Sequence, residues 1–324
     1  MLIDAIAPAV SGLQAAPQRP HFHLQALVKA ARSQGPLRVA VAYPCDAASL
    51  GAAIEAARIG LVIPVLVGPR ARMESVAGQS GVDLSGVEWH ETADDPRVAA
   101  TQAAALCRDG TAAALMKGSL HTDELLAAAV ARDAGLRTSR RASHAFVLDV
   151  PDFGRPLILT DCVVNIQPGL LEKRDIAQNA IGFAQAIGIA RPHMAILSAI
   201  ETVNPAIPST LDAAALCKMA DRGQITGAVL DGPLAFDNAV SMEAARTKGI
   251  VSPVAGDADI LVTPDLDSGN MVAKQLEYLG DAQVAGLVMG ARVPIVLTSR
   301  ADSAHSRIAS CALALLWLKH QATV

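Results

Sequence analysis

Short aliphatic runs alternate with Ala-rich or amphipathic stretches along most of the chain, and this alternation restricts the possible folds more than any other feature. The aliphatic runs predict strands at Leu37–Tyr43, Leu61–Val67, Ala113–Met116, His144–Val150, Pro156–Leu159, Met194–Leu197, Ala228–Leu230, Ile260–Val262, Val284–Met289 and Pro294–Leu297. The stretches between them predict helices at Ala47–Arg58, Pro96–Arg108, Leu170–Ile189, Leu211–Arg222, Ala239–Lys248, Gly269–Leu279 and Ser303–Lys319, with a further helix starting at Thr122. This order of elements is typical of an α/β fold with right-handed crossovers.

A chain of 324 residues is longer than a typical domain of ~100–200 residues, so the sequence predicts two α/β lobes. Hydrophobic residues make up 52% of the chain but aromatic residues only 3%, so Ala, Val, Leu and Ile must build the core. Because no flexible linker interrupts the pattern, we expect ordered segments to cross between the lobes and a rigid cleft to lie between them.

Charge and composition restrict the possible partners. The net charge of -4 argues against a nucleic-acid-binding surface, so an anionic substrate would need a local basic pocket. No apolar run approaches the ~20 residues of a membrane span, and the N-terminus reads as a short tail or a first helix, so no membrane association is expected. The five cysteines are scattered without a CxxC pair, which favours reduced thiols and a cytoplasmic protein.

Polar residues follow most of the predicted strands, and ligands of open α/β sheets bind beyond the carboxyl ends of the strands, where helix N-termini point. The strongest such segment is Thr298-Ser299-Arg300, between a strand and a helix. Its hydroxyls, backbone N–H groups and guanidinium suit a phosphate. A helix cap followed by a surface arginine explains the same residues, and spacing alone does not separate the two interpretations.

Two further segments carry groups suited to anions. Lys117 supplies a point charge, Gly118 permits close backbone approach, and Thr122 opens a helix. His121 stands between them, and a lone histidine in this setting is more often structural. Three arginines, Arg137, Arg140 and Arg141, fall within five residues. They suit a pyrophosphate or a 3′-phosphate, although a solvated basic loop has the same composition.

Several motifs are absent from the sequence. There is no GxGxxG after a strand, no GxxxxGK[ST] and no GxSxG. Hydrolysis by a P-loop or by a serine nucleophile is therefore disfavoured. The histidines are scattered without metal-ligand spacing, so no metal site is expected.

Beyond these separate motifs, the chain resembles the phosphate acetyltransferase/phosphate butyryltransferase family. The matching segments occur in the same order as in the family and extend from about Leu37 to Leu318. It is carried by LMKGSLHTDELL (115–126), LRTSRRASHAFVLDVPDF (136–153), ILTDCVVNIQPGLLEKRDIAQNAI (158–181), AILSAIETVNPAIPSTLDAAALCKMADRGQITGAVLDGPLAFDNAVS (195–241), SPVAGDADILVTPDLDSGNMVAKQLEYL (252–279) and ARVPIVLTSRADS (291–303). It is closest to the branch that includes phosphate butyryltransferases and the transferase half of bifunctional enoyl-CoA hydratase/phosphate acetyltransferases. A hydratase would need a hot-dog domain before Leu37, so we expect no hydratase activity.

The resemblance implies a fold like that of isocitrate/isopropylmalate dehydrogenases, with two α/β lobes around a cleft. The C-terminal helix of that fold returns to the first lobe, so we expect one lobe at 1–145 plus 300–324 and the other at 146–299. It also implies a homodimer or a larger homo-oligomer. The implied activity transfers a short acyl group, from acetyl to butyryl, between coenzyme A and inorganic phosphate. Coenzyme A is then a substrate, and no tightly bound cofactor or metal is expected.

The resemblance also assigns roles to particular residues. Ser299 and Arg300 match the serine–arginine pair of the family, with Arg300 holding the phosphoryl group and Ser299 donating to the phosphate or the oxyanion. Lys117 is a second phosphate-binding candidate. The loop of Arg137, Arg140 and Arg141, with Ser143, is expected to hold phosphate or coenzyme A anions. The remaining predicted substrate-binding residues are Gly118, His121, Asp265 and Asn270.

One position departs from the family pattern. The acetyltransferase branch carries an aspartate six residues after the arginine, proposed as the base for the thiol, and here that position is Ser306. Asp302 and His305 are the two candidates to replace it, although a helix cap is an alternative role for Asp302. A thiol with a pKa of ~8.5 also needs only modest help, so the arginines alone are a third possibility.

Two other functions remain open. A metal- and NAD-dependent dehydrogenase of the same fold would need His or Asp ligands contributed across the cleft, and no such histidine pattern is present. A non-catalytic coenzyme A-binding protein would explain Ser306, but Ser299, Arg300 and Lys117 count against it. The sequence does not determine the preferred acyl length, because one methylene changes binding by only ~1–3 kcal/mol.

Overall fold

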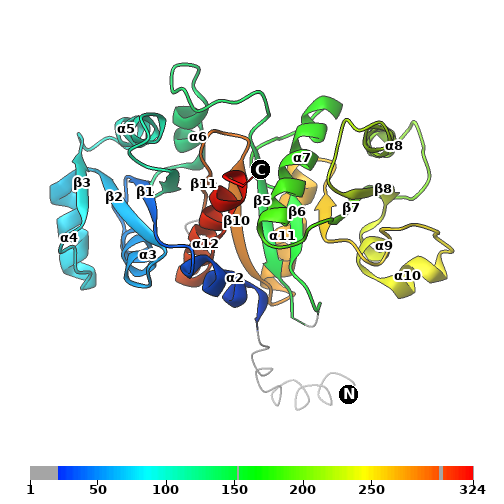
Figure 1. Ribbon diagram of the computed structural model, residues 1–324, viewed down its shortest axis with the longest axis horizontal. Helices are drawn as coiled ribbons and strands as arrows, with labels where there is room; N and C mark the ends of the chain where they lie inside the picture. The colour runs from blue at the N-terminus through cyan, green and yellow to red at the C-terminus, as the bar shows by residue number, and fades with distance from the viewer. Residues whose placement is uncertain (1–20, 152, 299–301, 324) are drawn as a thin grey trace, which may run out of the picture.

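The computed structural model describes residues 21–151, 153–298 and 302–323. Their strands form one eleven-stranded sheet in the order β3-β2-β1-β4-β11-β10-β5-β6-β9-β7-β8 (Figure 1). The strands are β1 (Leu37–Ala42), β2 (Val62–Gly68), β3 (Glu88–Glu91), β4 (Ala114–Lys117), β5 (Ser143–Asp149), β6 (Leu157–Thr160), β7 (His193–Leu197), β8 (Val229–Leu234), β9 (Ile260–Val262), β10 (Gln283–Met289) and β11 (Ile295–Val296). The helices are α2 (His23–Arg32), α3 (Ala47–Arg58), α4 (Arg70–Ser80), α5 (Pro96–Arg108), α6 (Thr122–Val130), α7 (Leu170–Ala186), α8 (Pro208–Asp221), α9 (Phe236–Val240), α10 (Met242–Thr247), α11 (Leu266–Tyr278) and α12 (Ala304–Gln321).

The sheet consists of two parallel blocks that run in opposite directions. Strands β3, β2, β1, β4 and β11 are mutually parallel, as are β6, β9, β7 and β8. Antiparallel pairings of β10 with β11 and β5, and of β5 with β6, join the blocks. In Figure 1 strands β1–β3 and helices α3–α5 (blue to cyan) lie at one end and β8 (yellow) at the other, while the C-terminal β11 and α12 return to the middle. The predicted α/β class is confirmed.

Most predicted elements are present, and their ends follow local chemistry. Asp95 caps α5 by accepting from the N–H groups of Arg97 and Val98, and Pro96 is the first helical residue. His121, one residue before the predicted start, is the N-cap of α6, whose first turn holds Asp123 and Glu124. These acids interact favourably with the positive end of the helix dipole.

Four elements differ from the prediction, and the first is helix α2, which was not predicted. The edge strand β3 was not predicted, because Glu-Trp-His-Glu contains no aliphatic run and the strand pairs only with β2. Helix α4 was also missed, because its sequence is polar with only Met73 and Ala77 buried. The helix predicted at Ala239–Lys248 is two short helices, because Ser241 is extended between them and its hydroxyl accepts from Ala244 N to cap the second one.

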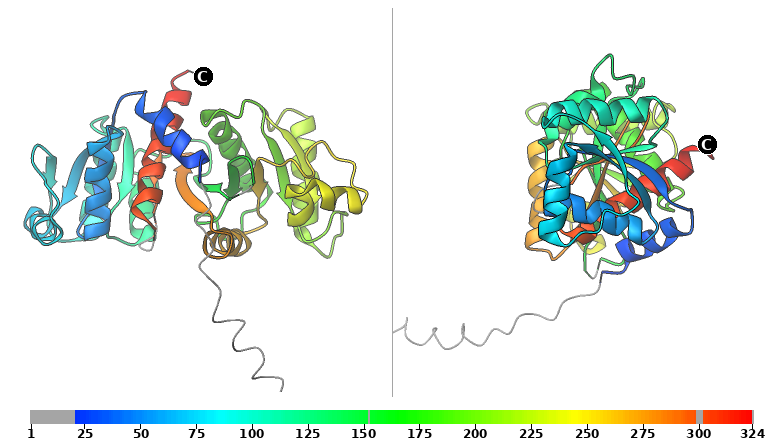
Figure 2. Two further views of the ribbon diagram at one scale, coloured as in Figure 1. Left: turned by 90° about the horizontal axis from the view of Figure 1, so that it is seen from below. Right: turned by 90° about the vertical axis from the view of Figure 1, so that its left-hand side faces the viewer.

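Helix α12 connects the two blocks at the centre of the molecule. It packs against α3 of the first block, α7 of the second, and β10 and β11 between them. Trp317 meets Phe183 of α7 edge-on, with ring centroids 6.3 Å apart. Helix α2 lies beside α12, which Figure 2 shows as blue against red. The two ends of the described chain therefore meet over the middle of the sheet.

The register of the central strands brings the ends of two opposed strands together. Leu115, Ile295, Val288 and His144 lie in one row across β4, β11, β10 and β5. In the next row Ala145 pairs with Thr160, the last residue of β6. Strand β4 ends at Lys117, one row beyond this pair. The segments that follow β4 and β6 therefore meet near the middle of the sheet, and this is where the cavities lie.

Candidate active site

A cavity of about 340 Å³ lies where β4, β5 and β11 meet α6 and α11. Its walls are formed by Lys117, Leu120, His121, Thr122, His144, Phe146, Val163, Asn270, Lys274, Leu297, Thr298 and Asp302. We refer to it as the first cavity. Of the predicted site residues, it brings together Lys117, His121, Asn270 and Asp302, which are up to 185 residues apart in the sequence.

Two buried cations surround Thr298 at the end of β11. Lys117 is 3% exposed, and its Nζ donates to the carbonyl oxygen of Thr298 at 3.2 Å. Nη1 of Arg307, also 3% exposed, donates to the hydroxyl of Thr298 at 2.9 Å. Such a concentration of positive charge in a protein of net charge -4 suits a bound anion. Arg307 was not predicted as a site residue, because the sequence pattern near the start of this helix indicates a surface arginine.

The predicted pair Ser299 and Arg300 lies outside the described residues. Asp302, which follows, is on the wall of the first cavity. The N-cap of α12 is Ser303, whose hydroxyl accepts from Ser306 N at 3.1 Å, so a helix cap is the wrong interpretation of Asp302. The hydroxyl of Ser306 contacts the same capping hydroxyl at 3.0 Å. His305 is in the first turn of α12 and is not among the described residues that line the cavity.

Helix α11 faces the first cavity with Asn270 and Lys274, one turn apart on the same side of the helix. Nδ2 of Asn270 donates to the carbonyl oxygen of Cys162 at 3.2 Å. Burial lowers the pKa of Lys274, but the hydrogen bond to Glu277 and the charge of Asp302 outweigh it and the net pKa is raised. Lys274 is therefore a charged group in the wall. The sequence prediction missed it, although its spacing of four residues from the predicted Asn270 places both side chains on one face of the helix.

Asp265 is the N-cap of α11. Its carboxylate accepts from Ser268 N at 2.8 Å and from Ser268 Oγ at 2.7 Å. This capping arrangement fixes the start of the helix that carries Asn270 and Lys274.

His144 is the most deeply buried polar residue of the first cavity, and the sequence prediction missed it. It is 0% exposed, and neither ring nitrogen has a hydrogen-bond partner in the described parts of the chain. Burial lowers the pKa of His144 to about 3, so the ring is neutral. Phe146 lies against it edge-on with ring centroids 4.3 Å apart. A histidine inside an otherwise aliphatic strand is the signal that could have identified it.

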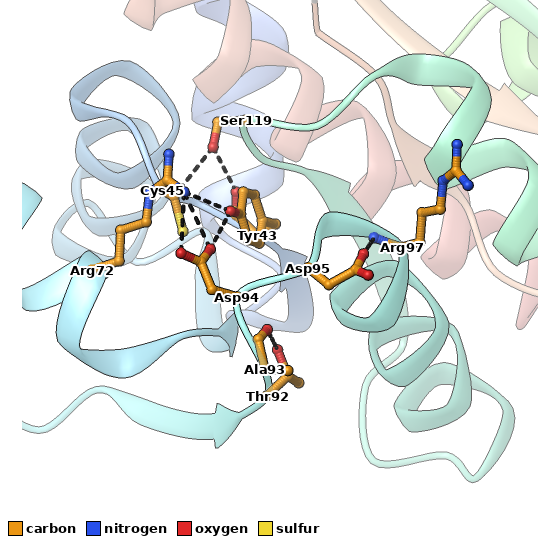
Figure 3. A network of polar contacts seen from close by, with 9 residues as sticks. All are labelled: Tyr43, Cys45, Arg72, Thr92, Ala93, Asp94, Asp95, Arg97 and Ser119. Carbon is orange, nitrogen blue, oxygen red and sulfur yellow. Dashed lines mark hydrogen bonds and ion pairs between the residues drawn. The ribbon is translucent and has the colours of Figure 1, made fainter.

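Gly118 and Ser119, which follow β4, contact the segment that follows β1. Figure 3 shows the contacts of Ser119. A Cβ at Gly118 would collide with the carbonyl oxygens of Ala42 and Tyr43, so only glycine fits this contact. The Ser119 hydroxyl donates to Tyr43 O and accepts from Cys45 N, both at 3.0 Å. Gly118 thus holds the segment after Lys117 in place, although it is not among the described residues that line the cavity.

Tyr43 and Cys45 both stay protonated in this arrangement. The Tyr43 hydroxyl bonds to Asp94 and accepts from Nη1 of Arg72 at 2.8 Å, as Figure 3 shows. Burial, aided by Asp94, raises the pKa of Tyr43 to about 12. Burial likewise raises the pKa of Cys45 to about 12, so its thiol is a poor nucleophile.

A second cavity, of about 640 Å³, lies beside the first. Its lining includes the predicted Arg137, Arg140 and Arg141, and the structure adds Arg174 of α7. Helix α6 forms a wall of both cavities, and the neighbouring residues Val163 and Val164 line one cavity each. The two cavities are therefore adjacent along one side of the sheet.

Arg141 is oriented by a chain of hydrogen bonds from a buried carboxylate. Asp161 accepts from the N–H groups of Val163 and Val164 at 2.9 and 3.0 Å, and from Nδ2 of Asn165 at 2.6 Å. The amide oxygen of Asn165 accepts from Nε of Arg141 at 2.8 Å. Burial raises the pKa of Asp161 although these donors oppose the shift. One carboxylate therefore shapes the turn between the cavities and orients an arginine of the second.

Ser143, predicted beside the arginines, is 0% exposed. Its hydroxyl bonds to Nδ2 of Asn179 at 2.8 Å, and it is not among the described residues that line either cavity. None of the helices in residues 21–151, 153–298 and 302–323 is long and apolar enough to cross a membrane. In the same ranges, no group of three or more His, Cys, Asp or Glu side chains is arranged to hold a metal ion.

An α/β sheet whose strand ends meet at two adjoining cationic cavities defines a protein that binds phosphate-bearing or other anionic small molecules. Residues 97–315 match the family described as phosphate acetyl/butaryl transferase. The chain is 58% identical to a phosphate acetyltransferase of Rhizobium meliloti over 90% of this chain and 92% of the relative. It is 42% identical to a phosphate butyryltransferase of Clostridium acetobutylicum over 90% and 96%. The chain therefore belongs to the phosphate acetyltransferase/phosphate butyryltransferase family, which confirms the resemblance.

Solved structures agree with this assignment. A branched-chain phosphotransacylase from Enterococcus faecalis V583 superposes with a TM-score of 0.76 at 31% identity, over 87% of this chain and 99% of that one. A phosphotransacetylase from Streptococcus pyogenes has a TM-score of 0.79 at 22% identity, over 91% of this chain and 99% of that one, and shows the shared fold.

Proposed function

We propose that this enzyme transfers a short acyl group, from acetyl to butyryl, between coenzyme A and inorganic phosphate: acyl-CoA + phosphate ⇌ acyl phosphate + CoA. Membership of the family supports the reaction. The single structural observation that carries it is the pair of buried cations, Lys117 and Arg307, that bond to Thr298. Lys117 and Thr298 line the first cavity, and Arg307 stands behind Thr298. A phosphate and an acyl phosphate are the small anions that such an enclosed positive site would hold.

The proposal divides the substrates between the two cavities. The phosphoryl and acyl groups would occupy the first cavity, where Leu120, Phe146 and Leu297 offer apolar walls for a short acyl chain. The anionic end of coenzyme A would lie along the second cavity, whose arginines suit a diphosphate and a 3′-phosphate. A substrate that spans both would lie beside the neighbouring residues Val163 and Val164, which line one cavity each. No tightly bound cofactor is part of this proposal.

The chemical step is a direct attack. Viewed from acyl phosphate, the coenzyme A thiol loses its proton and its sulfur attacks the carbonyl carbon. A tetrahedral oxyanion forms, and phosphate then leaves with the electron pair of the C–O bond. We assign Arg300 to the phosphoryl group and Ser299 to the phosphate or the oxyanion, with Lys117 as the second cation.

We propose Asp302, in preference to His305, as the base for the thiol. Asp302 lines the first cavity, whereas the hydroxyl of Ser306 is occupied at the N-cap of α12 by Ser303. With Ser303 as the cap, the carboxylate of Asp302 is not required to start the helix. Lys117 lines the same cavity, so a base and a cation stand around it.

The wider assignments are proposals as well. We infer two α/β lobes of the isocitrate/isopropylmalate-dehydrogenase type, at 1–145 plus 300–324 and at 146–299. The reversal of strand direction at β10 and β5 supports two units, although β11 of the second range pairs with β4 of the first. We also propose a homodimer or larger homo-oligomer, measurable by light scattering, and a cytoplasmic location, which the five unpaired cysteines support.

The test is phosphate-dependent release of coenzyme A from acetyl-CoA, propionyl-CoA and butyryl-CoA without added metal. We expect wild-type release to require phosphate and Arg300→Ala to lower kcat/KM by roughly 10²–10³-fold, because a charge-stabilising donor is lost. Arg58→Ala, which removes an exposed arginine paired with Glu55 on α3, is the matched control and should keep wild-type activity. Folded wild-type protein that binds coenzyme A but releases none from any of the three would refute the transferase.

The same assay separates the two candidate bases. Asp302→Asn should lower kcat by roughly 10²–10⁴-fold with little change in KM, because proton removal is lost while the shape is kept. His305→Gln should stay within threefold of wild type. The reverse ranking would assign the base to His305, and two unimpaired variants would leave the arginines as the only activation of the thiol.

A further inference from the structure

His144 is a buried polar side chain that the fold leaves without a partner. It is 0% exposed on the wall of the first cavity, and both ring nitrogens lack a hydrogen bond within the described chain. Leaving a polar group buried and unpaired lowers the stability of the fold. Buried polar groups in proteins are nearly always paired, so an unpaired one that faces a cavity points to a partner that arrives with the ligand.

The surroundings of the ring hold it by packing alone. The edge-on contact with Phe146 fixes one side. On β10, Gly286 leaves the space that the ring occupies, because a Cβ there would lie 2.5 Å from Nε2 and 2.9 Å from Cε1 of His144. The backbone at this point is already paired within the β10–β5 ladder, and Gly286 N donates to the Ser310 hydroxyl oxygen at 3.0 Å. The imidazole is thus positioned rigidly beside the cavity.

From this geometry we propose that His144 donates a hydrogen bond to the carbonyl oxygen of the acyl group and stabilises the oxyanion of the transfer step. This inference rests on the proposed transferase function. It adds a residue to the site that neither the serine–arginine pair nor the arginine loop includes.

The neutral state of the ring selects a donor role over a base role. Burial lowers the pKa of His144 to about 3, and a neutral imidazole carries one N–H donor. So weak a base cannot take the proton of a thiol with a pKa of ~8.5 to any useful extent. A neutral donor also binds free phosphate less tightly than a cation would. Its hydrogen bond therefore stabilises mainly the negative charge that develops on the carbonyl oxygen in the transition state.

The step balances without a proton passing through His144. The thiolate sulfur forms a bond to the carbonyl carbon while the C=O π pair moves onto the oxygen, which the imidazole N–H holds. The π bond then re-forms as the C–O bond to phosphate breaks, and phosphate leaves with that pair. In the reverse direction a phosphate oxygen attacks the thioester carbon, and coenzyme A leaves as the thiolate.

The test compares two variants of similar length, His144→Met without a donor and His144→Gln with an amide donor. His144→Met should fold, because it replaces an unpaired polar group with an apolar one. We expect it to lower kcat by roughly 10²–10³-fold with KM for phosphate within threefold, and His144→Gln to recover at least tenfold of that loss. His90→Gln, on the edge strand β3, is the matched histidine control.

The outcomes separate this inference from the proposed function. Wild-type protein without phosphate-dependent release of coenzyme A overturns both. If the wild type is active but the Met and Gln variants have equal kcat, whether both are active or both impaired, the oxyanion role alone is overturned. The reason is that a purely structural histidine would not distinguish an amide donor from a thioether. Melting temperatures of both variants confirm that folded proteins are compared.

Discussion

Single residues show how this fold treats buried polar groups. Lys117 and Arg307 are almost fully buried, and both are hydrogen-bonded to Thr298. Asp161 is buried but accepts from backbone N–H groups and from Asn165. His144 alone among these four has no partner in the described chain, and the fold accommodates it by keeping it uncharged. The buried groups with partners build the site, and the one without a partner is the group we assign to the reacting carbonyl.

The lowered pKa of His144 predicts a pH dependence of stability. Its pKa is about 3 in the fold against 6.5 for an ordinary histidine, so the unfolded chain binds a proton that the folded chain does not between these two values. The free energy of unfolding should therefore be unaffected above about pH 7.5 and fall as the pH drops through 6.5. At pH 5 the loss attributable to this residue should reach about 2 kcal/mol.

Urea unfolding of wild type and His144→Met at pH 7.5, 6.5, 5.5 and 5.0 measures this effect. Other groups titrate equally in both proteins, so the difference between the two curves isolates His144. Curves that stay parallel over this range would mean that the folded protein can charge the ring, and the neutral donor would lose its physical basis.

At the scale of elements, helix starts place the groups of the cavity walls. Helix α11 begins at Asp265 and presents Asn270 and Lys274 to the first cavity. Helix α12 begins with Ser303 as its cap, which leaves Asp302 on the wall. A carboxylate near a helix start therefore caps α11 but lines the cavity at α12. The difference depends on which residue accepts the first backbone N–H groups of the helix.

Substitution of Asp265 distinguishes capping from substrate binding. Asp265→Ala should lower the free energy of unfolding by about 1 kcal/mol, because Ser268 N loses its acceptor. Asp265→Asn should keep most of that stability and wild-type kcat/KM, since asparagine caps well without a charge. Chemical denaturation and the coenzyme A release assay give both quantities. A stable Asp265→Asn protein with strongly reduced kcat/KM would instead support the predicted substrate-binding role.

At the scale of the whole molecule, one carboxylate anchors helix α2 to the centre of the sheet. Asp149, at the end of β5 and 2% exposed, accepts from His23 N at 2.7 Å and from Leu24 N at 3.0 Å. These groups are more than 120 residues apart in sequence, and they anchor α2 beside α12 (Figure 2).

Removal of this carboxylate should loosen α2 without disturbing the cavities. Asp149→Ala leaves the two N–H groups without an acceptor, so we expect the local stability of α2 to fall by about 1–2 kcal/mol. Hydrogen exchange followed by mass spectrometry should show faster exchange in His23–Arg32, with Pro96–Arg108 of α5 as the internal reference. Unchanged exchange in α2 would show that packing on α12 holds the helix without the cap.

Much of the architecture was predictable because it depends on local patterns. The aliphatic runs marked every strand except β3, and Asp95-Pro96 marked the start of α5, because side-chain period and capping chemistry act over a few residues. The motif at Lys117 and the arginines of 137–141 pointed to anion binding for the same reason. What these patterns lacked was any signal for partners that lie far away in the chain.

The amino-acid order alone was sufficient for the α/β class, most element boundaries and the family of the chain. Long-range packing was needed to insert β11 between β4 and β10, to separate Lys117 and the arginines into two adjoining cavities, and to leave His144 buried without a partner. The reason is physical. Periodicity and capping reflect interactions between near neighbours, whereas burial, pKa and cavity shape depend on which distant segments the sheet brings into contact.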